Sequence, residues 1–180
     1  IMRFQSLIRN LAAYSFKLTF AAAVLCSAIF AQIPTPKAHL GFEPAEDRKV
    51  ADWPQITAYF KKLDTASPRV SVQKFGDSTL GRPMIVAYIS APENIAQLKK
   101  YSTISSKLAD PRTIKSETEL KGLIAQGKTV VAISCSIHST EIVASQMSMT
   151  LAHRLATAQD PDTLEILRNT ILLLIPSSNP

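Results

Sequence analysis

Apolar residues recur at helical spacing in some segments of this chain and at strand spacing in others. From Asp52 onward they recur every three to four residues, which predicts a helix with Asp52 as its N-cap that ends near residues 64–68. Residues 70–75 and 84–90 carry β-branched and aromatic side chains and predict two strands. The eight-residue connection "GDSTLGRP" between them contains two glycines and a proline, and it favours an antiparallel pair.

The segment that follows mixes helical and irregular patterns. Residues 92–101, "PENIAQLKKY", begin as a helix, whereas residues 102–113 are predicted to be irregular surface. A second helix is predicted in "SETELKGLIAQG", where Ser116 and Glu119 form a capping box and Gly127 ends the helix.

Residues 129–136, "TVVAISCS", are apolar and β-branched for most of their length, which is typical of a central strand covered on both faces. A helix follows in which every fourth residue is apolar: Val143, Met147, Leu151 and Leu155. A short helix then starts near Pro161, and residues 170–176 predict a last strand. The order α, β, β, α, α, β, α, α, β predicts an α/β domain, with a mixed β-sheet and helices on both of its faces.

The N-terminal residues have the composition of a secretory signal peptide. Arg3, Arg9 and Lys17 precede 14 mostly apolar residues, 18–31, and cleavage is expected after Ala31. This stretch is shorter than the about 20 residues of a transmembrane helix, although an uncleaved anchor is the alternative. We therefore expect export to the periplasm or the extracellular medium, with only transient membrane contact through residues 1–31.

Residues 32–45 contain prolines and no periodic pattern, so they are predicted to be a short linker arm before a domain that occupies residues 46–180. The chain ends on "LLLIPSSNP", an apolar strand-like run followed by the start of a loop. A domain seldom ends on an exposed strand of this kind. The sequence therefore predicts that this domain is truncated.

Composition limits the classes of partner. The chain has 180 residues, 46% of them apolar and 19% charged, as expected of a globular protein. Its net charge of +6 falls to +3 without residues 1–31, which leaves 17 basic and 14 acidic residues. No basic block with interleaved aromatic residues occurs, so no nucleic-acid partner is indicated. Cys135 is the one cysteine after residue 31, so no internal disulfide is expected even in an oxidising compartment.

The sequence "SCSIHSTEIVASQ" places His138 and Glu141 three residues apart, where the strand at 129–136 gives way to a helix. The carboxyl ends of strands are where α/β sheets bind ligands. An imidazole and a carboxylate at this spacing can converge on one cation, and nitrogen with oxygen ligands suits Zn²⁺. His138 and Glu141 are therefore candidate metal ligands, although a histidine that only packs at the strand end is an alternative.

A catalytic zinc needs a third protein ligand. His153 lies 12 residues beyond Glu141, which is about 18 Å along a helix and too far for a shared metal. His39 lies in the linker arm with no neighbouring ligand pattern and is predicted to be solvated. If the site is real, its third ligand lies after Pro180.

Three motifs together resemble the zinc carboxypeptidases of peptidase family M14, over about residues 41–180. That family has a His-x-x-Glu pair after a strand, a Gly-x-Ser-x-x-Gly-Arg turn between its first two strands, and an Asn-Pro that begins a later loop. The matching residues here are His138 with Glu141; Gly76, Ser78, Gly81 and Arg82; and Asn179 with Pro180.

The resemblance implies the N-terminal half of a zinc carboxypeptidase catalytic domain, with His138 and Glu141 as two Zn²⁺ ligands and a peptide as substrate. A third histidine ligand, a general-base glutamate and the substrate-binding arginines are expected beyond Pro180, so the chain alone should be inactive. Its mechanism would use a metal-activated water that attacks the scissile carbonyl. Thr140 stands where many members carry an arginine, which bears on substrate preference.

The sequence also suggests a nucleophilic Ser78, a nucleophilic Cys135 and a domain without catalysis. "FGDSTL" matches the Gly-Asp-Ser signature of secreted ester hydrolases, but Gly81 and Pro83 break any helix after Ser78, and a nucleophilic serine needs a strand-to-helix elbow. Cys135 lies in an apolar strand and is predicted to be inert packing. The more serious alternative is a secreted binding domain on the same scaffold that has lost catalysis.

Overall fold

The computed structural model describes residues 33–138 and 140–180, so the predicted signal peptide at residues 1–31 lies outside the described residues. In the described part, no helix combines the length and apolar character that crossing a membrane requires. Four strands form one sheet in the order β1-β2-β4-β3. They are β1 (Val70–Asp77), β2 (Pro83–Ile89), β3 (Thr129–Ser134) and β4 (Thr170–Ile175).

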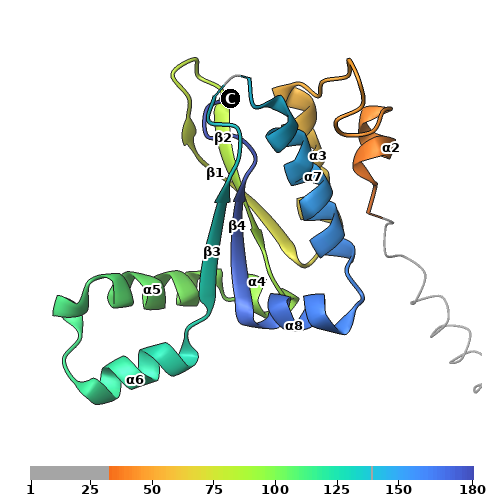
Figure 1. Cartoon of the computed structure of the whole chain (residues 1–180). Helices are drawn as coiled ribbons and strands as arrows, with labels where there is room; N and C mark the ends of the chain where they lie inside the picture. The colour runs from red at the N-terminus through yellow and green to blue at the C-terminus, as the bar shows by residue number, and fades with distance from the viewer. Residues whose placement is uncertain (1–32, 139) are drawn as a thin grey trace, which may run out of the picture. The chain divides into compact units, whose positions relative to one another are not determined.

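The sheet is mixed, as predicted. β1 pairs antiparallel with β2, and β2 pairs antiparallel with β4. β3 runs parallel to β4, with Val131 opposite Leu172 and Ser134 opposite Ile175. Because β3 and β4 are parallel neighbours, the segments that follow them emerge at the same edge of the sheet (Figure 1).

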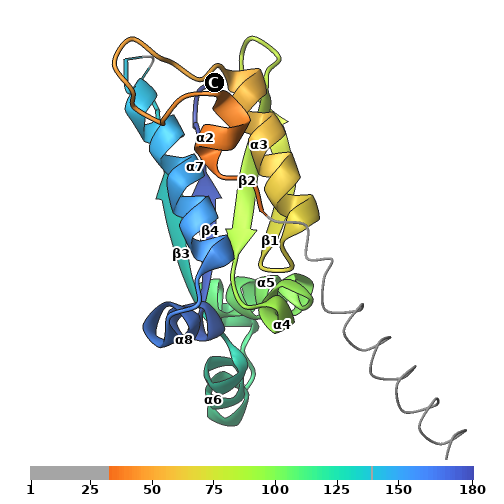
Figure 2. The ribbon, with the colours of Figure 1, turned by 90° about the vertical axis from the view of Figure 1, so that its right-hand side faces the viewer.

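One face of the sheet is covered by α3 (Trp53–Ala66) and α7 (Ile142–Thr157), which lie side by side in front of the strands in Figure 2. Asp52 caps α3 as predicted, since its side chain accepts the Gln55 N–H at 2.8 Å. The largest side chains that are fully buried between these helices and the sheet are Tyr59, Phe60, Leu63, Ile89, Met149 and Leu174.

The opposite face carries α5 (Leu98–Ala109), whose Tyr101 and Ile104 pack with Ile171 of β4. α6 (Glu117–Gln126) packs on α5, and two further short helices are α4 (Pro92–Ile95) and α8 (Pro161–Asn169). The prediction of helices on both faces of a mixed sheet is confirmed.

The prediction that residues 102–113 are irregular was wrong. α5 continues to Ala109, and a 3₁₀ turn follows at Pro111–Thr113. Tyr101, Ile104 and Leu108 lie at helical spacing and pack toward the sheet, while the intervening serines and threonines are exposed. Packing of the apolar stripe therefore overrides the low helix propensity of the polar positions.

β3 is an edge strand among the described residues, which contradicts the prediction of a central strand covered on both faces. Its Val130 and Val131 are 43% and 41% exposed, although they point to opposite sides of the pleat. Within residues 33–138 and 140–180, β3 pairs with β4 along one edge and with no strand along the other.

Residues 33–45 pack against α3 through α2 (Pro36–Leu40), whose Leu40 joins the core. The Tyr59 hydroxyl donates to the Pro34 carbonyl at 3.0 Å, and burial raises the pKa of Tyr59. His39 Nε2 lies 2.9 Å from the Gln55 carbonyl oxygen. The prediction that His39 is solvated was wrong, because α2 folds back onto α3 and half buries the imidazole.

The N-cap of α8 gives a pH-dependent prediction. The Asp160 carboxylate accepts the Thr163 N–H at 2.8 Å, and this bond lowers the pKa of Asp160. Its stabilising contribution is therefore present above the unfolded-state value of about 3.9, and it is lost as the pH falls through the lower folded-state pKa. We expect Asp160→Asn to be less stable than the unsubstituted chain at pH 6 and equally stable near pH 2, in urea unfolding followed by circular dichroism. A stability difference that did not change with pH would contradict this.

Candidate metal centre

The candidate centre lies where the chain leaves the parallel strands β3 and β4. Hydrogen bonds join the two exits, since Cys135 N donates to Ile175 O and Ser178 N donates to Cys135 O, each at 3.0 Å. Figure 1 shows the C-terminal end of the chain beside the connection from β3 to α7. The topology therefore delivers two loops to one edge of the sheet, as expected for a ligand site in an α/β fold.

His138 and Glu141 face each other in this connection. Nδ1 of His138 lies 2.9 Å from Oε1 of Glu141. The other carboxylate oxygen, Oε2, accepts the backbone N–H groups of Ile137 and His138, each at 3.1 Å. The loop thus orients the Glu141 carboxylate so that Oε1 points toward the imidazole.

This arrangement favours the ionised carboxylate. The hydrogen bond from the His138 ring, followed by the one from the His138 backbone N–H, lowers the pKa of Glu141. Both side chains remain accessible, with 74% of His138 and 44% of Glu141 exposed. The site can therefore present an imidazole nitrogen and a carboxylate oxygen to a ligand from solvent.

A cavity of about 210 Å³ opens beside the pair. Trp53 forms part of its wall, and the Trp53 indole N–H donates to the Pro83 carbonyl at 3.0 Å, which joins the start of α3 to the start of β2. Other side chains around His138 and Glu141 come from their own loop and from three further segments, the β1–β2 turn, α7 and the β4 exit: Arg82, Ser136, Ser145, Ser177 and Asn179.

The donor atoms fit Zn²⁺, which is bound in proteins by histidine nitrogen and carboxylate oxygen. The described residues contain no group of three His, Cys, Asp or Glu side chains that could hold a metal ion. His153 lies near the C-terminal end of α7 and does not line the cavity, and His39 lies between α2 and α3. The centre therefore consists of His138 and Glu141 among the residues described.

A family model of the zinc carboxypeptidases (peptidase family M14) matches residues 56–180. The chain belongs to the zinc carboxypeptidase family. The match includes β1 to β4 and the loop with His138 and Glu141, so the family resemblance of the sequence motifs is confirmed. A comparison with curated protein sequences gives no match.

The fold of this chain matches that of a solved carboxypeptidase. Carboxypeptidase A from Helicoverpa armigera matches with a TM-score of 0.51 and 19% identity, over 81% of this chain and 30% of the other. Thrombin activatable fibrinolysis inhibitor (TAFI) matches with a TM-score of 0.47 and 12% identity, over 79% of this chain and 29% of the other. This chain thus spans about 30% of the length of the solved structures it matches.

Ser78, which the ester-hydrolase reading would make a nucleophile, lies in the turn between β1 and β2. Its N–H donates to the Arg82 carbonyl at 2.8 Å, and its hydroxyl accepts the Arg82 N–H at 3.2 Å. Gly81 adopts a φ of 72°, a left-handed conformation that favours glycine. The turn leads into a strand, so Ser78 lacks the strand-to-helix elbow of a serine hydrolase.

Cys135 is 5% exposed, and burial raises the pKa of its thiol. A raised pKa disfavours the thiolate that nucleophilic chemistry requires, in agreement with the prediction that Cys135 is inert packing.

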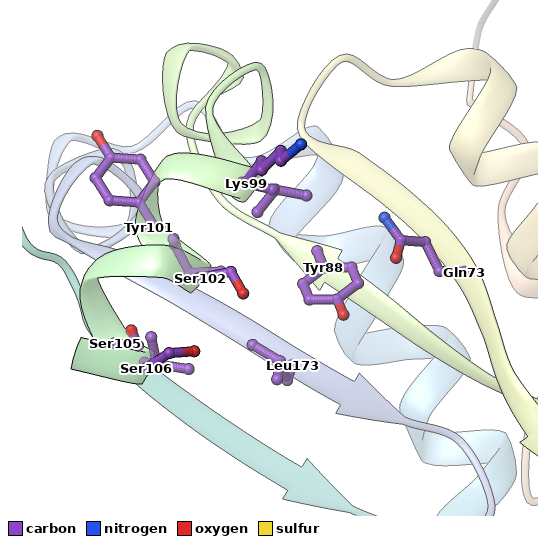
Figure 3. Close-up of a pocket in the computed structure, with 11 residues that line it drawn as sticks. Gln73, Tyr88, Lys99, Tyr101, Ser102, Ser105, Ser106 and Leu173 are labelled. Carbon is purple, nitrogen blue, oxygen red and sulfur yellow. The ribbon is translucent and has the colours of Figure 1, made fainter. Parts of the chain in front are cut away.

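A second cavity, of about 430 Å³, lies on the α5 side of the sheet. Figure 3 shows Tyr88 and Leu173 of the sheet facing Ser102, Ser105 and Ser106 of α5 across this cavity. Its lining contains neither a histidine nor a carboxylate, so it offers no metal ligand of the kind found at His138 and Glu141.

Sequence reasoning missed three serines beside the metal pair: Ser136, Ser145 and Ser177. They come from the β3 exit, the first turns of α7 and the β4 exit. One signal was available: Ser136 follows β3 and Ser177 follows β4. If these two strands are parallel neighbours, the serines that follow them lie at the same edge of the sheet.

Proposed function

We propose that this chain supplies two of the metal ligands of a zinc-dependent carboxypeptidase, His138 through Nδ1 and Glu141 through Oε1. The observation that carries this proposal is the 2.9 Å approach of these two atoms within a chain of the zinc carboxypeptidase family. The proposal takes the third ligand, a histidine, from sequence beyond Pro180.

The residues of this chain would prepare the site. The N–H groups of Ile137 and His138 hold one oxygen of Glu141, and the other oxygen faces His138 Nδ1, where a bound metal would take the place of the ring hydrogen. Zinc, when bound, lowers the pKa of a water ligand to about 7 and polarises a carbonyl oxygen. Arg82 brings a positive charge to the same cavity, where it can attract an anionic or carbonyl group of a substrate. The general-base glutamate and the arginines that hold the substrate carboxylate are proposed to lie beyond Pro180.

The proposed substrate is a peptide with a free C-terminal carboxylate, which is the substrate class of the family. Export to the periplasm or the extracellular medium is part of the proposal. It is supported by the basic residues and the apolar stretch of residues 1–31. Cys135 is the one cysteine among residues 33–138 and 140–180, so no disulfide joins two of these residues.

The proposal can be tested on the intact protein, with any sequence that follows Pro180. We expect about one zinc per chain by elemental analysis, as in catalytic zinc sites. A peptide with a free C-terminal carboxylate should lose its last residue, and the same peptide with a C-terminal amide should not. A chelator should abolish this activity, and added zinc should restore it.

Other results would support an alternative function or contradict the proposed one. Bound zinc without hydrolysis of any peptide would indicate a binding domain that has lost catalysis. Ester hydrolysis that needs no zinc and disappears in Ser78→Ala would indicate the ester hydrolase. A protein that contains no zinc, and takes none up, would contradict the proposed function.

A further inference from the structure

We propose that Ser136, Ser145 and Ser177, called here the serine cluster, are positioning residues that hold His138 and Glu141 in their facing arrangement. This inference rests on the proposed function, because it assigns the serines to the preparation of the metal site. All three side chains are at least nine-tenths buried, with exposures of 9%, 7% and 4%. The hydroxyls of Ser136 and Ser177 donate to the loop backbone, and the hydroxyl of Ser145 donates to that of Ser136, so these bonds leave the side chains of His138 and Glu141 facing each other.

Ser136 lies at the centre of the cluster. Its hydroxyl donates to the Glu141 carbonyl at 2.6 Å and accepts from the Ser145 N–H at 3.2 Å and the Ser145 hydroxyl at 2.7 Å. A serine hydroxyl has one hydrogen to donate and two lone pairs, so its bonding capacity is filled. The same hydroxyl therefore ties the first turns of α7 to the backbone of a candidate metal ligand.

The backbone at Ser136 shows that this loop is held in an uncommon conformation. Its φ is 46°, in the left-handed region that favours glycine. Two other non-glycine residues with positive φ, Ala45 and Arg48, are exposed, whereas Ser136 is buried. Strained backbone of this kind persists where the surroundings fix it, and it is often found at functional sites.

Ser177 adds a restraint from the neighbouring strand. Its hydroxyl donates to the Ser136 carbonyl at 3.1 Å and accepts the Asn179 N–H at 3.2 Å. The Asn179 side chain also approaches the loop, with Nδ2 3.4 Å from the Ile137 carbonyl. The exits of β3 and β4 and the start of α7 are thus joined on both sides of Ser136.

These contacts lead to the metal pair by a short route. Ser136 fixes the Glu141 carbonyl, and the N–H groups of residues 137 and 138 fix the Glu141 carboxylate. A shift of the backbone between residues 136 and 141 would move both the His138 imidazole and the Glu141 carboxylate. Loss of a serine hydroxyl should therefore weaken metal binding even in a folded protein.

The test uses Ser145→Ala in the intact protein, with Zn²⁺ as the probe and a competing chelating dye as the reporter. Ser148→Ala is the matched control, because Ser148 is also a buried serine of α7 and its hydroxyl donates to a helix carbonyl, that of Ser145, at 2.6 Å. We expect Ser145→Ala to raise the zinc dissociation constant about 10- to 100-fold, as for residues that orient metal ligands. Ser148→Ala should stay within about twofold of the unsubstituted protein, since it does not reach the loop.

A measurement on the metal-free protein separates an effect on the position of the loop from an effect on the stability of the fold. Amide exchange at Ile137 and His138, whose N–H groups bind the Glu141 carboxylate, should be faster in Ser145→Ala than in Ser148→Ala. Ser136→Gly gives a second variant, because glycine accepts the left-handed backbone and lacks the hydroxyl. We expect it to weaken zinc binding as Ser145→Ala does, and it carries the test if Ser145→Ala fails to fold.

The possible failures are distinguishable. Tight zinc binding by the unsubstituted protein, retained in both Ser145→Ala and Ser136→Gly, would overturn the positioning role and leave the proposed function standing. An equal loss of zinc affinity in Ser148→Ala would also overturn it, because stability alone would then explain the effect. An unsubstituted protein that binds no zinc would overturn the proposed function, and this inference with it.

Discussion

His138→Ala is expected to weaken zinc binding by the intact protein more than about 100-fold, since losing only a hydrogen-bond partner of a metal ligand already costs about 10- to 100-fold. The substitution removes the nitrogen that lies 2.9 Å from Glu141 Oε1, and with it one of two candidate ligands. Glu141→Ala should cause a comparable loss, because it removes the carboxylate oxygen. Zinc content after dialysis, and the dissociation constant from chelator competition, would measure both effects.

The chain offers matched controls for both substitutions. His153→Ala removes an imidazole from α7, outside the cavity that His138 lines. Glu165→Ala removes a carboxylate from α8, where Glu165 pairs with Arg168 at 2.7 Å. Both control proteins should retain their zinc. If His138→Ala and Glu141→Ala retained as much zinc as these controls, the two residues would not be ligands.

Most of the fold could be predicted because its signals are local. The N-caps Asp52 and Asp160 bind N–H groups three residues ahead, so each helix start is encoded within four residues. The connection with Gly81 likewise gave the antiparallel pair of β1 and β2 directly. Such features depend on near neighbours in sequence, which a single chain displays.

The errors arose where burial depends on distant segments. The apolar positions Val143 and Met147 of α7 are 54% and 43% exposed, while Ser145 and Ser148 are buried. Their hydroxyl groups can be buried because each has a hydrogen-bond partner: Ser145 donates to the Ser136 hydroxyl, and Ser148 donates to the Ser145 carbonyl. Similarly, the apolar pattern of β3 indicated a covered strand, but pattern alone does not say which segment covers it.

In the candidate site, too, short-range features could be predicted from the sequence and long-range contacts could not. His138 and Glu141 are three residues apart, so their approach follows from one turn and could be predicted from spacing. Ser177 meets Ser136 across 41 residues of sequence. That contact exists because β4 lies between β2 and β3 in the sheet, a strand order that the sequence pattern did not provide.

Phe60→Ala is expected to lower the free energy of unfolding by about 3–5 kcal/mol, the usual effect of emptying a buried aromatic site. Phe60 lies on α3 with no exposed surface, and its ring meets that of Tyr59 edge-on at 6.3 Å between centroids. Phe75→Ala is the matched control, because Phe75 of β1 is 51% exposed. It should change stability by less than about 1 kcal/mol, as surface substitutions usually do. Urea unfolding of the metal-free proteins would measure both.

Phe60→Ala also separates the stability of the fold from the geometry of the site. Phe60 does not line the cavity beside His138 and Glu141, whereas Trp53 and Ile56 of the same helix do. The zinc dissociation constant of folded Phe60→Ala should therefore stay within a few-fold of the unsubstituted protein, while Ser145→Ala should alter it strongly. A parallel loss of zinc affinity and stability in both variants would mean that the site depends on the whole core. An affinity change confined to Ser145→Ala would mean that the hydroxyl groups near the β3 and β4 exits determine the geometry of the metal site. The packing of the hydrophobic core would then have little influence on zinc affinity.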